Sequence, residues 1–427
     1  TTWNTYNSTT FSAETLPGTT IKSTVTGSSL TSVGTLGSLT VTGDVTVDTN
    51  TLKVDATNNR VGIANASPAY TLDVNGTVEA TQFLQGTDYL SPYQGFRNKI
   101  INGSFEFWQR GTARTYINAG SYLADRWTIR LYQNGSHQRN TVTPVTGMQT
   151  RYALKVGSST TGENAGGARM WANTELESGD SIPLRGKTVT LSFWVRFSSA
   201  TCSSSTATAY GDWSGSVDWC TSTTDAAIGA TAADGGSGVT LTNGSLPTTW
   251  TKYTTTATLP SNINNVGVQF GFAGLGNTAS ADTVWYEVTQ VQLEIGSVAT
   301  PFEQRPQQTE LALCQRYYQK SYDVTTAPAT STEVGMYTFY GTSNVYALLI
   351  GTVHLKVPMR VTPTTITYYN SSGTAGVWNA FNTSGAALSP SMTTVYSGNQ
   401  SFSTYGSLTN SYASGGMYGQ WTATAEL

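Results

Sequence analysis

Short hydrophobic pairs dominate residues 25 to about 90. The two members of each pair are two positions apart, as in Leu52/Val54, Val61/Ile63 and Leu72/Val74, and turn-forming residues separate the pairs. This alternation predicts short β-strands, and Asn75-Gly76 is a hairpin signal. Two inward side chains per strand cannot offset backbone ordering, which costs roughly 1–2 kcal/mol per residue. We therefore expect identical chains to complete a trimeric β-shaft over residues 25–93; a small β-meander packed on the next domain is the alternative.

A second pattern of longer alternating stretches covers residues 94–305. Ala153–Val156, Thr188–Phe197 and Val266–Phe272 alternate as half-buried strands do. Together with the length of the region and the lack of a long helical period, they predict an antiparallel sandwich of about ten strands. Four tryptophans in strand-like runs are expected in the core: Trp108, Trp127, Trp194 and Trp285.

The last region, residues 306–427, begins with a helical pattern. The spacing predicts a helix over Thr309–Lys320 with Thr309 as its cap, and places Leu311, Cys314 and Tyr318 on one face. Cys314 is therefore interpreted as a small buried apolar group rather than a nucleophile. Strands should follow, so the region is predicted to be a second β-sandwich with one short helix; they are expected around Val334–Tyr340, Tyr346–Lys356, Thr365–Tyr369 and Gly419–Leu427.

Charge is scarce along the whole chain. Charged residues make up 11% of the sequence and the net charge is −3, so no basic patch is expected for nucleic acid. No apolar run reaches the length of a membrane span, and the first residues lack a signal-peptide pattern. We therefore expect no membrane insertion and synthesis in the cytoplasm. Residues 1–24 contain only Trp3, Tyr6 and Phe11 as aromatic anchors, which suits a frayed terminus or a segment that orders on a larger partner.

Catalytic groups are sparse, which favours a non-enzymatic role. His137 and His354 have no recognisable nucleophile motif beside them. A glycosidase needs two carboxyl groups about 5–10 Å apart. The candidates for such a pair are Asp212 with Asp218, which flank Trp213, and the turn with Glu175, Glu177 and Asp180. Solvated loop carboxylates are common, so catalysis there is the less favoured alternative.

Cysteines and metal-ligand patterns add little. With three cysteines and no Cys-x-x-Cys or clustered histidines, the sequence predicts no zinc and no cofactor. Cys202 and Cys220 could form a bridge or remain two reduced thiols. The sequence leaves that choice open.

Aromatic residues support a binding function. The chain has 11 Trp, 23 Tyr and 13 Phe, and a sugar stacks its C–H face on an aromatic ring while nearby Asn, Ser and Thr bind its hydroxyl groups. Two regions have this make-up, although each ring could instead cover core or a trimer interface. The candidates are Tyr210, Trp213 and Trp219 in the first region and Trp378, Phe381, Tyr396, Phe402 and Tyr405 in the second.

Three stretches resemble phage tail fibres. VGIANASPAYTLDVNGTVEATQFL at Val61–Leu84 resembles a unit that precedes their distal domains and also occurs in some bacterial surface proteins. GFRNKIINGSFEFWQRGT and VWYEVTQVQLEIGSVATPFEQRP resemble the first and last strands of a jelly-roll domain found in tail fibres and related carbohydrate-binding modules. ELALCQRYYQKSY and VPMRVTPTTITYY resemble a distal tail-fibre domain. Glu106 and Gln292 or Glu294 match positions near a structural calcium in some related modules, but without clustered Asp ligands no metal is predicted.

The resemblance implies an all-β receptor-binding protein of a virion tail. Its expected parts are a tail-anchoring segment (1–24) in which Trp3, Tyr6 and Phe11 contact tail adaptor or nozzle proteins, a trimeric β-shaft (25–93), a jelly-roll domain (94–305) and a C-terminal receptor-binding β-sandwich (306–427). A homotrimer would bind a host surface polysaccharide or lipopolysaccharide. A tailspike-like glycan depolymerase and a secreted bacterial adhesin or carbohydrate-binding module are the alternatives.

Overall fold

The structure is a computed structural model and is mostly β. It describes residues 40–47, 51–76, 78, 84–85, 88–89, 96–115, 121–131, 135–158, 169–199, 214–222, 239–242, 245–273, 285–341, 345–382, 387–412 and 415–426. Strands account for 44% of the structure and helices for 6%, which confirms the all-β prediction. The chain divides into two compact units, Thr1–Thr81 and Gln82–Leu427, and each is described by itself.

The first unit is a small four-stranded sheet. Its strands follow one another in the order β1 (Val45–Val47), β2 (Leu52–Asp55), β3 (Arg60–Ile63) and β4 (Leu72–Val74). Four of the predicted hydrophobic pairs are therefore confirmed as strands. The β1–β2 and β2–β3 pairs are antiparallel, whereas β3 and β4 are parallel.

The residues that would pair with β4 across a hairpin at Asn75-Gly76 fall outside the described residues, so that hairpin stays a prediction. β4 is an edge strand of its sheet, and no later strand among the described residues pairs with it. A parallel pair needs a crossover connection rather than a tight turn. Here the segment between β3 and β4 makes that connection, and Arg60 Nη1 donates to the Pro68 carbonyl within it at 2.9 Å.

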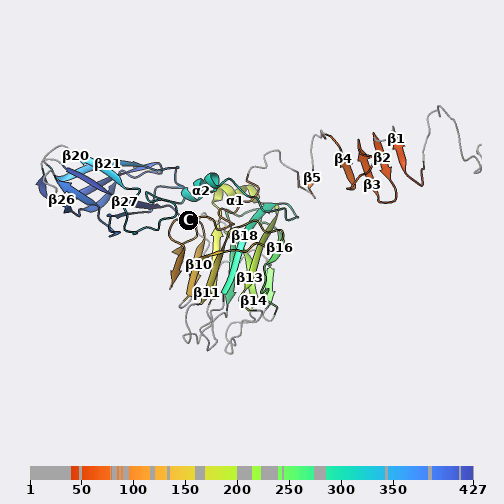
Figure 1. The fold of residues 1–427 in the computed structure, drawn as a ribbon, viewed down its shortest axis with the longest axis horizontal. Helices are drawn as coiled ribbons and strands as arrows, with labels where there is room; N and C mark the ends of the chain where they lie inside the picture. The colour runs from red at the N-terminus through yellow and green to blue at the C-terminus, as the bar shows by residue number, and fades with distance from the viewer. Residues whose placement is uncertain are drawn as a thin grey trace, which may run out of the picture. The chain divides into compact units, whose positions relative to one another are not determined.

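Two six-stranded antiparallel sheets form the jelly-roll part of the second unit (Figure 1). One sheet has the order β16 (Thr251–Thr258), β13 (Thr188–Phe197), β18 (Trp285–Ile295), β11 (Tyr152–Ser158), β10 (Gly135–Thr141), β7 (Ala113–Thr115). The other has the order β15 (Val239–Thr242), β14 (Ser214–Ser222), β17 (Asn265–Ala273), β12 (Arg169–Glu175), β9 (Thr128–Leu131), β8 (Ser121–Tyr122). A short helix α1 (Ser178–Ser181) and a 3-10 turn η2 (Ile182–Leu184) complete this part. The second unit also contains a separate pair, β5 (Leu84–Gln85) with β6 (Asp88–Tyr89).

The inner faces of these two sheets share one core. Phe193 on β13 lies 5.0 Å from Phe270 on β17 in an edge-to-face arrangement, and Trp127 contacts both Phe105 and Phe270. Trp108 and Trp127 are buried as expected. Trp194 and Trp285 are only half-buried, so their expected place in the core is wrong. Trp194 packs against a small separate cluster, and the Arg196 guanidinium lies over the Trp285 ring.

The last part of the second unit is built around one long strand, β27 (Gly415–Thr424). β19 (Tyr318–Lys320), β20 (Tyr337–Gly341), β22 (Thr365–Tyr369) and β23 (Asn379–Asn382) all pair with β27, and β24 (Ala387–Leu388) pairs with β23. A second sheet has the order β21 (Val345–His354), β26 (Ser401–Tyr412), β25 (Ser391–Val395). Their shared core includes Trp378, Phe402 and Trp421.

The predicted helix is shorter than expected and begins earlier. α2 spans Gln307–Gln315, with Pro306 at its N-cap position, so Thr309 lies inside the helix and does not cap it. The helix stops because Tyr318–Lys320 pairs with β27, and tertiary pairing overrides the local helical pattern. Cys314 is a free, fully buried thiol, as predicted. Within the described part of the chain, none of the helices has the length and hydropathy needed to cross a bilayer.

Buried ion pairs connect the end of β27 to the jelly-roll sheets. The Glu426 carboxylate accepts from Arg110 at 2.8 Å and from Arg126 at 2.5 Å, and both arginines precede β9. Arg316, just after α2, donates to Glu177 at 2.7 Å. Lys320 donates to the Gln109 carbonyl at 2.6 Å. We call the Glu426–Arg110–Arg126 contact the carboxylate clamp.

Candidate functional site

An exposed group of aromatic side chains lies on the outer face of β20, β27 and β23. In the register, Tyr340 and Phe381 flank Gly416 from opposite sides. Tyr418 is two residues further along β27, so it shares their face. Met417 and Trp421 point to the other face and are buried in the core. The three rings therefore stand on the side of the sheet that the core does not use.

The rings are close enough to form one surface. The Tyr340 and Phe381 ring centroids are 5.9 Å apart at 71°, and those of Phe381 and Tyr418 are 6.1 Å apart at 49°. Tyr340 is 73% exposed, an unusual value for a large aromatic residue. Phe381 and Tyr418 are half-buried. We call Tyr340, Phe381, Tyr418 and the Gly416 backbone beneath them the aromatic platform.

Gly416 allows the two outer rings to approach the sheet. A Cβ atom at this position would lie 2.6 Å from Phe381 Cζ and 3.1 Å from Tyr340 Cδ1. The rings therefore occupy the space that a side chain would fill, and the Gly416 backbone beneath them is buried.

Polar, uncharged side chains continue the same face. Thr338 and Asn379 flank Tyr418 in the register, as Tyr340 and Phe381 flank Gly416. Thr338 is exposed, and its hydroxyl can both donate and accept. Asn379 is held in place because its Oδ1 accepts from the Ser371 amide at 2.9 Å. The arrangement pairs apolar ring faces with hydrogen-bonding groups, as a sugar requires.

The sequence prediction found one member of the aromatic platform, Phe381. Tyr340 and Tyr418 were missed: Tyr340 was taken only as the end of an expected strand, and Tyr418 lies just before the expected strand Gly419–Leu427. The available signal was glycine: the segments YTFYG and GGMYGQW place small residues between aromatic ones. A glycine opposite two aromatic residues leaves their rings without a neighbour to pack on and so favours an exposed group.

The prediction for Trp378 is corrected by its burial. Its side chain is fully buried, stacks on Phe339 at 5.8 Å and donates from Nε1 to the Gln420 carbonyl at 2.8 Å. It also covers Gly419, whose Cβ would lie 2.1 Å from Trp378 Cδ1. A ring enclosed in this way has no face to offer a sugar. Phe402 is likewise fully buried and is a core residue.

Tyr396 and Tyr405 lie on the other sheet of the C-terminal part. Tyr396 follows β25, has a φ of 48° and is 83% exposed. Tyr405 lies in β26, paired with Thr393 and Ile350, and is half-buried. The structure does not bring either residue onto the face of Phe381, so their glycan-binding role stays a prediction.

The other predicted aromatic residues lie outside the C-terminal part of the chain. Tyr210 and Trp213, and the tail-anchoring residues Trp3, Tyr6 and Phe11, fall outside the described residues. Trp219 lies in β14, opposite Val268 of β17. Cys202 also falls outside the described residues, so the choice between a bridge and free thiols with Cys220 stays open.

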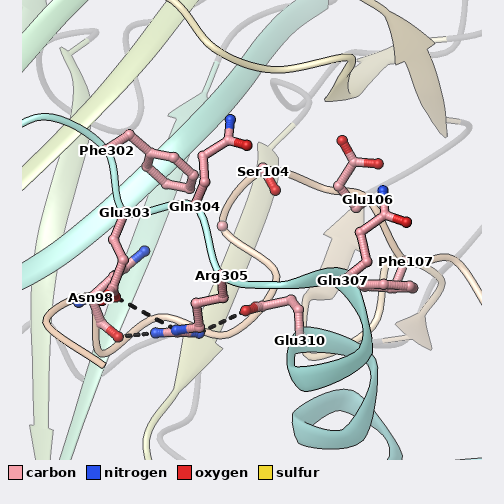
Figure 2. A pocket seen from close by; sticks show the side chains of 11 residues that line it. Asn98, Ser104, Glu106, Phe107, Phe302, Glu303, Gln304, Arg305, Gln307 and Glu310 are labelled. Carbon is pink, nitrogen blue, oxygen red and sulfur yellow. Dashed lines mark hydrogen bonds and ion pairs between the residues drawn. The ribbon is translucent and has the colours of Figure 1, made fainter. Parts of the chain in front are cut away.

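A small polar pocket of about 60 Å³ lies where the segment after β18 crosses residues 98–107. Figure 2 shows Arg305 reaching between Asn98 and Glu310 across its base. The charged side chains of this pocket bind each other or nearby backbone. Arg305 Nη1 donates to Glu310 at 2.9 Å, and Glu303 accepts from the Asn98 backbone amide at 2.8 Å. The pocket has room for a few water molecules and not for a sugar ring.

Among the carboxylates proposed for the alternative glycosidase, Glu177 is engaged in structural contacts. Glu177 accepts from Arg316 at 2.7 Å and from the Tyr317 hydroxyl at 2.5 Å. Those hydrogen bonds lower its pKa despite the opposing effect of burial. Burial raises the pKa of Asp180. Asp212 falls outside the described residues.

The two histidines differ in their surroundings. His137 is fully buried in β10, and burial together with the charge of Arg114 lowers its pKa to about 4. His354, at the end of β21, is exposed. The described residues contain no group of three or more His, Cys, Asp or Glu side chains that could hold a metal ion.

Comparisons with known proteins give only distant matches. No protein-family model and no curated protein matches the chain. Among solved structures, it is similar to the enzymatically active domain of tailspike protein 4 of bacteriophage CBA120, with 13% identity, 47% of this chain and 22% of that chain covered, and a TM-score of 0.25. A family 11 carbohydrate-binding module from Clostridium thermocellum, in complex with a β-1,3-1,4-mixed-linked tetrasaccharide, matches at 10% identity over 44% of this chain and 99% of that chain, with a TM-score of 0.20. A family 16 carbohydrate-binding module matches at 13% identity over 34% of this chain and 77% of that chain, with a TM-score of 0.19. These likenesses are too weak to indicate what this chain binds.

Proposed function

We propose that this chain is a non-enzymatic, trimeric receptor-binding fibre of a phage tail that holds a host-surface polysaccharide or lipopolysaccharide at the aromatic platform. The observation that carries the proposal is the grouping of the exposed Tyr340 ring with Phe381 and Tyr418, because contiguous apolar surface is typical of a binding site, whereas a single exposed ring is ordinary. Residues 1–24 would attach the fibre to tail adaptor or nozzle proteins.

The small first unit supports the trimeric part of the proposal. Among its described residues only Gly62 and Pro68 are buried. Leu72 is 63% exposed, and Val41, Val47 and Val78 are 45–47% exposed. A sheet with so little internal core needs further apolar surface to be stable, and two identical chains would supply it. Three platforms on one fibre would then raise a weak single-site affinity through avidity.

Binding to immobilised bacterial surface polysaccharide tests the proposal. Tyr340→Ala and Phe381→Ala should each weaken retention of the full chain at least tenfold, about 1.4 kcal/mol, while circular dichroism and oligomeric state stay unchanged. Tyr70→Ala is the matched control, because Tyr70 is 74% exposed in the first unit. Retention that is insensitive to both platform substitutions would refute this site.

Gly416, which lies beneath the two rings, provides a second test. Gly416→Ala should displace the Phe381 and Tyr340 rings and weaken retention, although it removes no aromatic group. Gly398→Ala is its control in the same part of the chain, because a Cβ there meets only Ser401 O at 3.7 Å. Equal retention by the two variants would show that the positions of the Phe381 and Tyr340 rings over Gly416 do not matter for glycan binding.

The two alternatives give different results in the same material. A depolymerase would release soluble fragments from the polysaccharide during incubation, whereas the proposed fibre would leave its length unchanged. A secreted adhesin would bind the glycan but would not attach to phage tails that lack their fibres.

A further inference from the structure

We infer that the aromatic platform binds an uncharged saccharide rather than an acidic one. The inference rests on the proposed function, and it names the class of ligand. It begins from the sequence: no Asp, Glu, Lys, Arg or His occurs from Val361 to Ala425, and none occurs from Val334 to Val353. The three strands that carry the platform lie within these two stretches.

The residues around the platform leave an acidic sugar without a counter-charge. Among the described residues of β20, β23 and β27, this face presents the exposed Tyr340 and Thr338 and the half-buried Phe381, Tyr418 and Asn379. The connections that follow β20 and β23 and precede β27 consist of Thr, Ser, Asn, Gly and Ala. A carboxylate or phosphate is ordinarily held by Arg or Lys, and placing one against aromatic rings without such a partner costs free energy.

The nearest charged residue along these strands lies close to one end of the platform. Gln420 donates to the carbonyls of Thr332 and Val334, so Glu333 lies at the level of Gln420. Gln420 is two residues from Tyr418, about 7 Å along β27, which is within the Debye length of about 8 Å at physiological salt. Glu333 is itself acidic, and any remaining effect would repel an anionic glycan.

A neutral pyranose satisfies every group on this face. Its C–H patch can stack on the open Tyr340 ring, and its edge can reach the half-buried Phe381 and Tyr418 rings beside it. Its hydroxyl groups can exchange hydrogen bonds with Thr338 and the tyrosine hydroxyls. Binding of this kind involves no ion pairing, so it should hardly depend on ionic strength.

The test compares neutral and acidic polysaccharides on the full chain. The neutral probes are mannan, dextran and galactan, and the acidic probes are alginate, hyaluronan and polysialic acid. We expect retention on at least one neutral probe, a loss of at least tenfold with Tyr340→Ala or Phe381→Ala, and less than a twofold change between 20 and 500 mM NaCl.

The outcomes separate this inference from the function on which it rests. Platform-dependent retention confined to the acidic probes, or retention that falls more than tenfold with salt, overturns the inference and leaves the glycan-binding function intact. A matched pair sharpens the comparison: the free C6 hydroxyl groups of a bound neutral polysaccharide that is not linked through C6 are oxidised to carboxylates, and the product should lose its retention. Binding to neither class, nor to the bacterial surface polysaccharide used above, removes the proposed function itself.

Discussion

The Trp378 side chain shows how one residue can be assigned to the wrong side of a sheet. In sequence it stands among Gly, Asn and Ser, the surroundings expected of a binding loop. In the structure it precedes β23 and fills the space above Gly419, whereas Phe381, three positions later, reaches the opposite face. Polar neighbours indicate a loop, but they do not indicate which face a ring covers.

Replacing Trp378 should therefore affect stability before it affects binding. Trp378→Ala is expected to lower the free energy of unfolding by about 3–5 kcal/mol, because it removes a fully buried ring and leaves a cavity. Urea unfolding followed by tryptophan fluorescence measures the change. Tyr396→Ala, at a side chain that is 83% exposed, should change stability by less than about 0.5 kcal/mol. A stable Trp378→Ala protein that no longer binds glycan would contradict this reading.

His137 should make the protein sensitive to acid. Its folded pKa of about 4 lies below the usual 6.5 because burial disfavours the charged ring. As the pH falls through 6.5, the His137 imidazole is protonated in the unfolded chain but stays neutral in the folded chain. Stability is therefore lost between pH 6.5 and pH 4, and the loss should reach about 2 kcal/mol at pH 5.

The measurement compares unfolding free energies of wild type and His137→Leu at pH 7 and pH 5. The variant should lose about 2 kcal/mol less than wild type on acidification. Burial also raises the pKa of Asp125 to about 6, which works in the opposite direction, but this contribution is common to both proteins and cancels in the difference. Identical pH dependence of the two proteins would show that His137 is not the acid-sensitive group.

At the scale of elements, β27 carries most of what the sequence could not predict. A strand at the end of the chain was predicted from its alternating pattern, and β13 and β22 were predicted with their observed bounds, because alternation over several residues is a local signal. The pairing of β27 with four other strands comes from segments up to about a hundred residues away. The platform depends on that pairing, so only Phe381 could be recognised in advance.

The carboxylate clamp should be the main electrostatic contact between β27 and the jelly-roll part. Arg126 is 2% exposed and Arg110 is 14% exposed, and Glu426 lies between them. Glu426→Ala leaves the buried Arg126 guanidinium without its carboxylate and leaves Arg110 with only Asp125 at 3.6 Å, so we expect a loss of about 3 kcal/mol or more in the free energy of unfolding. Glu303→Ala, at another paired carboxylate in the same unit, tests whether any such loss is specific.

Thermal unfolding with and without 1 M NaCl measures this prediction. The clamp is buried, so added salt should not reproduce the effect of Glu426→Ala. A variant as stable as wild type would mean that the two arginines find other partners when the carboxylate is removed.

At the scale of the whole molecule, the prediction concerns the oligomeric state. The exposed apolar residues of the first unit belong to a sheet with almost no core of its own. Light scattering of the full chain should give a mass three times that of one chain. Leu72→Asp should shift the protein toward monomer, because it places a charge where neighbouring chains would meet.

A matched control is available in the second unit. Val145 is 42% exposed and lies outside the shaft, so Val145→Asp should leave the oligomer intact. A wild-type protein that stays monomeric, or a Leu72→Asp variant that remains trimeric, would remove the proposed role of this sheet.

The course of β27 also determines how the protein would respond to force. The strand begins next to the aromatic platform at Gly416 and ends next to the carboxylate clamp at Glu426, with hydrogen-bonded neighbours on both edges. A glycan pulling on the platform would load this strand along its length, so its cross-strand hydrogen bonds would resist together in shear instead of opening one after another. Under such a force, the sugar would dissociate from the rings before the sheet unfolds.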